Sequence, residues 1–145
     1  MSAELYQKLL VDHGKRPRNF GPLPGADRSA EGNNPLCGDE LTMRLKLSGG
    51  RIAQLAFEGA GCAVCIASAS LLTLAVTGLL PDQASRVAAE VAALVDGREV
   101  DEARLGDLMA LSGVARFPAR RKCAMLAWRA LEAALAGSGA RVTTE

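Results

Sequence analysis

The clearest pattern in the sequence is a strict alternation of hydrophobic and polar residues over positions 41–47, with four apolar side chains on one face. Such alternation is typical of a half-buried antiparallel strand. Ser48-Gly49-Gly50 follows as a hairpin connection, and residues 51–57 return as the partner strand with one apolar face formed by Ala53, Leu55 and Phe57. The two segments together predict a β-hairpin.

Apolar residues at helical spacing predict four helices around this hairpin, over residues 2–13, 62–77, 81–95 and 118–136. Ser2 is the expected cap of the first helix, and Gly78 and Gly97 mark the ends of the second and third. The second helix is expected to pack through Val64, Leu71, Leu74 and Ala75. Shorter features are expected too: a strand over 27–31, a helix over 105–111 and a frayed tail from about residue 137.

The order of these elements, strands first and helices afterwards, indicates the fold class. With 145 residues and no internal repeat, the chain is expected to form a single domain over 1–145. We predict an α+β fold in which a small antiparallel β-sheet packs against helices on one face.

Composition and charge exclude several classes of function. A net charge of +1 and only five aromatic residues argue against a nucleic-acid partner. The uncharged stretch over residues 59–81 raises the question of a membrane span, but its interruption by glycine, serine and threonine favours a buried helix. Because the N-terminus lacks the pattern of a secretory signal, we expect a cytoplasmic protein with no membrane partner.

The loop over residues 33–39, Asn-Asn-Pro-Leu-Cys-Gly-Asp, carries the first candidate site residues. Proline fixes the entry to a turn and glycine frees the backbone after the cysteine. Cys37 and Asp39 therefore lie at i and i+2 of a tight loop, where a sulfur and a carboxylate can converge on one point. This arrangement suits a metal ion.

Two more cysteines lie at helix beginnings far along the chain. Cys62 and Cys123 each fall in or near the first turn of a predicted helix, where the helix dipole favours thiolates. Together with Cys37 and Asp39 they form a set of three sulfurs and one oxygen that suits tetrahedral zinc or iron. From spacing alone, buried and inert thiols remain an equal alternative.

Three further residues near these motifs have both a structural and a functional interpretation. Cys65 completes a Cys-x-x-Cys pattern with Cys62, as a spare ligand, a resolving thiol or a small packed residue. Arg120 shares a helix face with Cys123 and is predicted to support the site from outside the ligand set, by hydrogen-bonding Asp39 or steadying thiolates. His13, the only histidine, suits the C-terminus of its helix as a dipole partner, or else acts as a ligand or base.

Three separated motifs in this order resemble the IscU/NifU N-terminal family of iron–sulfur cluster assembly proteins. They are Asn34–Asp39, Gly59–Ser70 and Phe117–Trp128. Two features resemble the SufU-like branch of this family. Lys122 stands where scaffold members carry histidine, and the segment between the last two motifs is long. The resemblance implies an IscU/SufU-like α+β domain with a metal site formed by Cys37, Asp39, Cys62 and Cys123.

The resemblance also implies a function in iron–sulfur cluster biogenesis. The chain is expected to be a zinc-dependent sulfurtransferase, an enzyme that accepts persulfide sulfur on Cys37 from a SufS-like cysteine desulfurase and serves downstream iron–sulfur assembly proteins. One alternative is an IscU-like scaffold on which iron at the same ligands forms a [2Fe-2S] or [4Fe-4S] cluster for transfer. A third is a binding module with a purely structural zinc.

Overall fold

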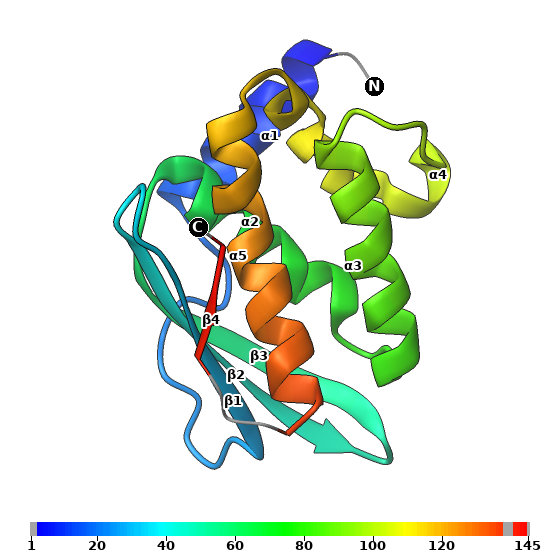
Figure 1. Cartoon of the computed structure of the whole chain (residues 1–145). Coiled ribbons are helices and arrows are strands. Elements are labelled where there is room, and N and C mark those ends of the chain that lie inside the picture. The colour runs from blue at the N-terminus through cyan, green and yellow to red at the C-terminus, as the bar shows by residue number, and fades with distance from the viewer. Residues whose placement is uncertain (1–2, 138–140, 145) are drawn as a thin grey trace.

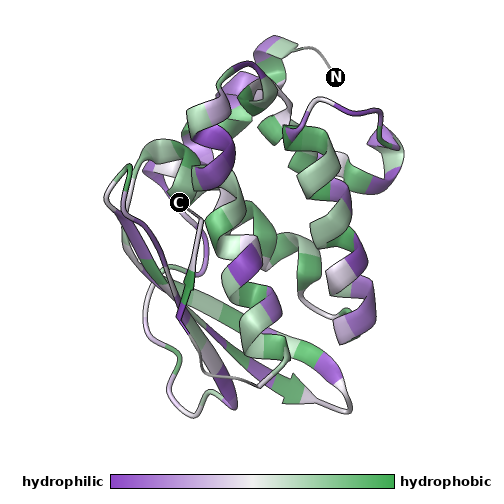
Figure 2. Ribbon diagram, in the orientation of Figure 1, coloured by the Kyte–Doolittle hydropathy of each residue, from purple (hydrophilic) through white to green (hydrophobic). Residues whose placement is uncertain are grey.

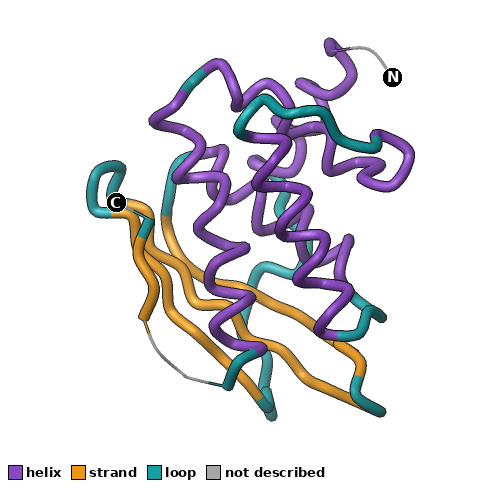
Figure 3. Tube along the Cα trace, turned by 45° about the vertical axis from the view of Figure 1, so that its right-hand side comes forward, coloured by secondary structure: helices purple, strands orange, loops and turns teal. Residues whose placement is uncertain are grey.

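The computed structural model describes residues 3–137 and 141–144 and has two layers, a sheet with helices on one face (Figure 1). The elements, in chain order, are α1 (Ala3–Lys15), β1 (Arg28–Asn34), β2 (Asp39–Ser48), β3 (Arg51–Ala60), α2 (Ala63–Val76), α3 (Pro81–Val95), α4 (Glu102–Leu105), the 3₁₀ helix η1 (Gly106–Arg116), α5 (Pro118–Leu135) and β4 (Arg141–Thr143). The strand order is β3-β2-β1-β4. Figure 3 shows the sheet from the side, with the helices stacked against it.

The antiparallel β1–β2–β3 meander confirms the predicted α+β class and the hairpin. Gly49 and Gly50 form the two-residue connection, and both have positive φ angles, 60° and 78°, as a type I′ turn requires. The strand predicted over 27–31 is β1, which is longer than expected. Hydrophilic and hydrophobic residues alternate along the strands (Figure 2), so one face of the sheet is buried under the helices.

The buried face of β3 differs from the predicted one near the start of the strand. Lys46 pairs with Gln54 but Leu47 pairs with Ile52, so Ala53 is an extra residue in the ladder. This bulge turns Ala53 to the solvent and buries Ile52. Leu55 and Phe57 remain on the core side, as expected. The prediction for Ala53 was wrong because alternation cannot reveal an inserted residue.

The helices α2, α3 and α5 confirm three predicted helices to within two residues at each end. One packing prediction fails: Leu74 of α2 is 53% exposed, whereas Ser68 and Ser70 are buried. The serines are buried because they carry inter-helix hydrogen bonds. Ser68 Oγ donates to the Ala124 carbonyl (2.6 Å) and accepts the Trp128 indole N–H (3.1 Å), which fixes α2 against α5.

Three local predictions are corrected or untested. The expected short helix over 105–111 is a turn of α-helix, α4, followed by the 3₁₀ helix η1 over 106–116. The expected frayed tail contains β4, whose residues 141–143 pair in parallel with β1. The proposed Ser2 cap lies outside the described residues, while α1 itself extends to Lys15. Within the described ranges, no helix has both the length and the apolar character needed to cross a membrane.

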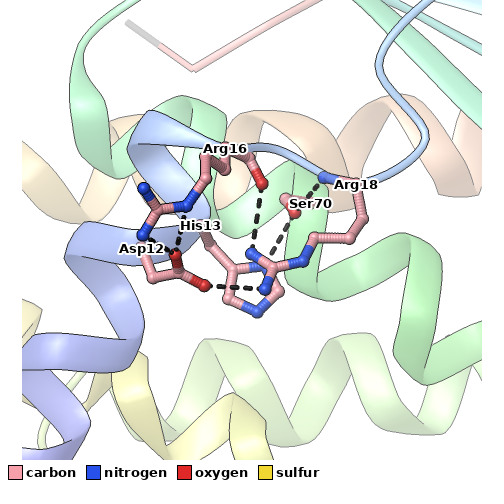
Figure 4. Close-up of polar contacts among 5 residues, drawn as sticks. All are labelled: Asp12, His13, Arg16, Arg18 and Ser70. Atoms are coloured by element: carbon pink, nitrogen blue, oxygen red, sulfur yellow. Dashed lines mark hydrogen bonds and ion pairs between the residues drawn. The ribbon is translucent and has the colours of Figure 1, made fainter.

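His13 is buried at the end of α1 and ties that helix to α2 (Figure 4). Its Nδ1 lies 2.7 Å from Ser70 Oγ, which also accepts the backbone N–H of Arg18 at 2.8 Å. Asp12 binds the guanidinium groups of Arg16 and Arg18 beside it, both at 2.6 Å. These contacts favour a structural role for His13.

We expect His13 to make folding stability depend on pH. Burial, and then the charge of Arg18, lower its pKa, and Asp12 and Asp107 oppose this shift only in part. The folded pKa lies below the unfolded value of about 6.5. The stability that the neutral, buried His13 contributes is therefore fully present above that pH and is lost as the pH falls toward the folded pKa.

Denaturant unfolding of the wild type and His13→Gln across pH 5 to 8 measures this effect. The difference in stability between the two proteins should be constant above pH 6.5. Below it the wild type should lose stability relative to the variant, with a slope approaching about 1.4 kcal/mol per pH unit. Parallel curves for the two proteins would show that His13 does not titrate in this way.

Candidate metal centre

The loop between β1 and β2 positions two of the predicted ligands. Asn34 and Asp39 face each other as the last pair of the β1–β2 ladder, and residues 35–38 close the turn between them. The Asn34 carbonyl accepts the N–H of Cys37 at 3.2 Å. Gly38 has φ of 71°, a conformation that favours glycine, so the chain can reverse directly after Cys37. Cys37 is therefore half-buried on a turn, beside the buried Asp39.

The other two predicted ligands come from α2 and α5. Cys62 is the N-cap residue of α2, and its backbone N–H donates to Asp39 Oδ1 at 2.8 Å. Cys123 lies at the start of the second turn of α5, near the first turn as expected, and is fully buried. The two helices thus direct both cysteines toward the β1–β2 loop.

The structure brings three of the four predicted ligands into one group. The ligand atoms of Cys37, Asp39 and Cys123 all lie within 4.8 Å of one another. Cys62 lies outside this group, although its backbone N–H donates to Asp39 Oδ1 and its thiol contributes to raising the pKa of Cys123. Cys62 is therefore adjacent to the group without being part of it.

Asp39 provides the test of whether a cation fits here. Its side chain is fully buried, and Oδ2 has no hydrogen-bond partner among the residues that the structure describes. A buried carboxylate oxygen without a partner is costly unless a cation or a donor compensates it. The thiols of Cys37 and Cys123 lie within 4.8 Å of an oxygen of this carboxylate, so the donor set suits zinc or iron. The residues present therefore fit a metal ion.

The environment of Cys123 favours its neutral form when no cation is present. Burial is the main cause that raises the pKa of this thiol, followed by hydrogen bonding with Asp39, Cys37 and Cys62. The three thiols and the Asp39 carboxyl can each carry a negative charge, and because they lie together they cannot all ionise without a compensating positive charge.

Arg120 lies where the sequence placed it, one turn before Cys123. Its side chain is exposed, and hydrogen bonding with Cys123, then the charge of Cys62, raise the pKa of the guanidinium. The cation therefore interacts with two of the thiols at the outer edge of the group.

Cys65 is fully buried on the inner side of α2 and belongs to the hydrophobic core. Burial raises the pKa of its thiol, and the charges of Asp39, Cys62 and Cys37 act in the same direction. It is not part of the metal-ligand group found among the described residues. This placement agrees with the interpretation of Cys65 as a small packed residue.

One polar residue of the site was missed by the sequence reasoning. Asn34 is fully buried, and its Nδ2 lies 3.6 Å from Cys123 Sγ. An asparagine before proline is typical of a turn, so the sequence did not indicate a buried side chain. Only the pairing of Asn34 with Asp39 at the end of the β1–β2 ladder shows that this side chain points inward.

The fold and this group define a small α+β domain with a candidate metal centre made of cysteine and aspartate. The model of the NifU-like N terminal domain matches residues 5–144. The chain therefore belongs to the NifU-like N-terminal family, as its motifs suggested.

Individual relatives are similar along most of their length. The zinc-dependent sulfurtransferase SufU of Bacillus subtilis is 41% identical over 91% of this chain and 90% of its own. The iron–sulfur cluster assembly scaffold protein IscU of Streptococcus pyogenes is 39% identical over 90% of this chain and 82% of its own. Among solved structures, a putative iron–sulfur cluster assembly scaffold protein for the SUF system from Fervidobacterium islandicum superposes with a TM-score of 0.84 and 32% identity, covering 93% of this chain and 99% of that chain.

Proposed function

We propose that this protein acts in iron–sulfur cluster biogenesis as a zinc-dependent sulfurtransferase. The observation that carries the proposal is the buried Asp39 carboxylate, whose Oδ2 has no hydrogen-bond partner among the described residues and which lies close to one buried and one half-buried thiol. Such a group can hold a cation while leaving one sulfur accessible to a partner. The similarity to a relative named as a zinc-dependent sulfurtransferase supports the same assignment.

Cys37, Asp39, Cys62 and Cys123 are the residues that would hold the zinc ion. When bound, zinc keeps the thiols deprotonated and has no redox chemistry of its own. Asp39 offers the hard oxygen ligand of the set, and its second oxygen remains fixed by the Cys62 N–H. Arg120 supplies a positive charge at the solvent side, where it can steady the thiolates.

Cys37 is our choice for the sulfur acceptor because it is the more accessible thiol of the group and lies on a turn next to Gly38. In the reaction, the Cys37 thiolate attacks the terminal sulfur of a persulfide on the desulfurase. A new S–S bond forms on Cys37 and the old S–S bond breaks. The desulfurase cysteine leaves as a thiolate, so sulfur and charge are conserved without an external oxidant.

The partner in this proposal is a cysteine desulfurase of the SufS type, acting with this protein in the cytoplasm. The acceptor thiol must enter the active site of that enzyme, which requires an exposed surface around Cys37. Leu36 directly precedes Cys37, and Phe117 lies just before the helix that carries Cys123. They are among the most exposed large hydrophobic residues described, at 72% and 61%. They suit the rim of such a contact.

The second candidate is a scaffold that assembles an iron–sulfur cluster on the same thiolates. Relatives named as scaffold proteins, at 39% and 34% identity, favour it, and three thiols with one carboxylate are compatible with cluster ligation. In this case the cluster is cargo, and Cys37, Cys62, Cys123 and Asp39 would hold it until transfer. We rank it second because the half-buried Cys37 suits a thiol that reacts.

Cysteine turnover by a SufS-type desulfurase, with a reductant and with or without the zinc-loaded protein, tests the proposal. We expect strong stimulation by the wild type and none by Cys37→Ala, because the nucleophile is absent. Cys65→Ser is the matched control: this thiol is buried in the core and should not matter. Mass spectrometry after alkylation should find the added sulfur on Cys37.

The two candidate functions predict different results for the same samples. A wild type that does not stimulate the desulfurase, but holds a stable visible chromophore after anaerobic reconstitution with iron and sulfide, would establish the scaffold instead. If zinc binds tightly and neither result is seen, the ion is structural.

A further inference from the structure

Asn34 is a fully buried amide that contacts the candidate metal centre without belonging to its ligand set. It is the last residue of β1, and its side chain points to the helix-covered side, where Nδ2 lies 3.6 Å from Cys123 Sγ. Its Oδ1 has no hydrogen-bond partner among the described residues. The chain therefore tolerates a costly buried amide at this position.

The amide N–H is suited to a thiolate. A protonated Cys123 can donate to the Ala119 carbonyl, whose oxygen lies 3.8 Å from Sγ, but an ionised Cys123 has no proton to offer it. The sulfur then acts only as an acceptor, and the buried Nδ2–H of Asn34 is directed at it. Arg120 also interacts with this sulfur, but from the exposed side, where water weakens its effect.

Asn34 contacts two cysteines of the site, Cys123 and Cys37, in different ways. Its side chain contacts Cys123 on a rigid helix, while its backbone carbonyl accepts the N–H of Cys37 on the turn. Only the sulfur of Cys123 therefore receives an amide donor from Asn34. From Asn34, Cys37 receives a contact to its backbone only, and its sulfur receives none.

We infer that Asn34 is a positioning residue that holds Cys123 as the fixed thiolate of the centre, so that Cys37 is the sulfur that leaves the metal. The inference rests on the proposed function, because it assigns separate tasks to two thiols of that site. Asn34 acts through Cys123 and does not itself bind the metal or the transferred sulfur.

Cobalt(II) substitution tests the contact directly, because the sulfur-to-cobalt charge-transfer band reports on the donor sulfur. Removing a hydrogen bond from a thiolate raises the energy of its lone pairs, so the band of Asn34→Ala should move to longer wavelength. Release of cobalt to a chelator should be about tenfold faster than from the wild type, as is usual for the loss of such a contact.

Two other variants complete the experiment. Asn34→Asp keeps the size of the side chain but replaces the N–H by a carboxylate oxygen, so it should release cobalt faster still. Asn33→Ala is the matched control: Asn33 is the neighbouring residue, and alternation along β1 places it on the opposite face of the sheet. Its band and release rate should equal those of the wild type.

Wild-type band positions and release rates in both Asn34 variants would overturn the inference. Since the aspartate variant preserves the packing, a folding defect of the alanine variant does not prevent this decision. The proposed function is tested separately by sulfur transfer in the wild type. A wild type that binds cobalt but accepts no sulfur contradicts that function, while the cobalt comparison still decides whether Asn34 holds Cys123.

Discussion

Replacing Gly59 by alanine is expected to destabilise the protein by about 2 to 6 kcal/mol and to displace Cys62. Gly59 has φ of 147°, which favours glycine, and a Cβ at this position would lie 2.1 Å from the Glu40 carbonyl oxygen and 2.6 Å from Leu41 Cα. Both atoms belong to the backbone of β2, so neither can move without opening the β2–β3 ladder. Asp39 begins that strand, so the metal centre would be distorted as well.

Two other glycines separate the causes of this effect. Gly38 has a positive φ of 71°, but a methyl group on its Cα would meet no atom within 4 Å, so Gly38→Ala should show only the cost of backbone strain. Gly113 has neither a positive φ nor a close neighbour, and Gly113→Ala should be close to neutral. Urea unfolding of the three variants measures the series.

The expected order of destabilisation is Gly59→Ala, then Gly38→Ala, then Gly113→Ala. A Gly59→Ala protein as stable as the Gly113→Ala protein would show that β3 can leave β2 at this point without penalty. The strand ending at Ala60 would then not be what holds Cys62 next to Asp39.

The hairpin was predictable because its pattern is local. Alternation over residues 41–47 and the Ser-Gly-Gly connection specify both strands and their turn without any distant contact. The bulge at Ala53 was not predictable, since an inserted residue leaves the composition of the strand unchanged. β4 was missed for a related reason: three residues are too few to show a period, and their pairing with β1 depends on contacts far away in sequence.

The candidate site was likewise predictable only as far as local motifs reach. The motifs identified Cys37, Asp39 and Cys123, which the fold brings within 4.8 Å of one another. They could not show that Cys62 lies at the margin of the group, because that depends on how the first turn of α2 meets the β1–β2 loop. Nor could they show that Asn34 is buried against Cys123, because its neighbours in sequence indicate a turn.

Asp39→Asn is expected to make the metal-free protein more stable, by about 1 to 3 kcal/mol, and to weaken zinc binding by at least about 100-fold. The amide oxygen can still accept the Cys62 N–H, as Asp39 Oδ1 does now. The second oxygen, which has no partner among the described residues, is replaced by an N–H group that can donate to a neighbouring thiol. The variant thus removes a buried charge without losing the contact that orders α2.

Unfolding with a chelator and with excess zinc measures both effects in one experiment, with Glu40→Gln as the control. Glu40 is the next residue of β2 and is exposed, so its substitution changes the net charge equally while leaving the centre intact. Zinc should stabilise the wild type and the control strongly, and Asp39→Asn only weakly, because stabilisation by a ligand grows with its affinity.

The order of stabilities should therefore reverse between the two conditions: Asp39→Asn above the wild type without metal, and below it with zinc. This reversal cannot arise from a residue that only supports the fold, because such a residue changes stability in the same direction in both conditions. A variant less stable than the wild type in both would show that the Asp39 carboxylate is compensated within the protein. The buried aspartate would then belong to the architecture of the β1–β2 loop, and the case for a cation at this centre would rest on the thiols alone.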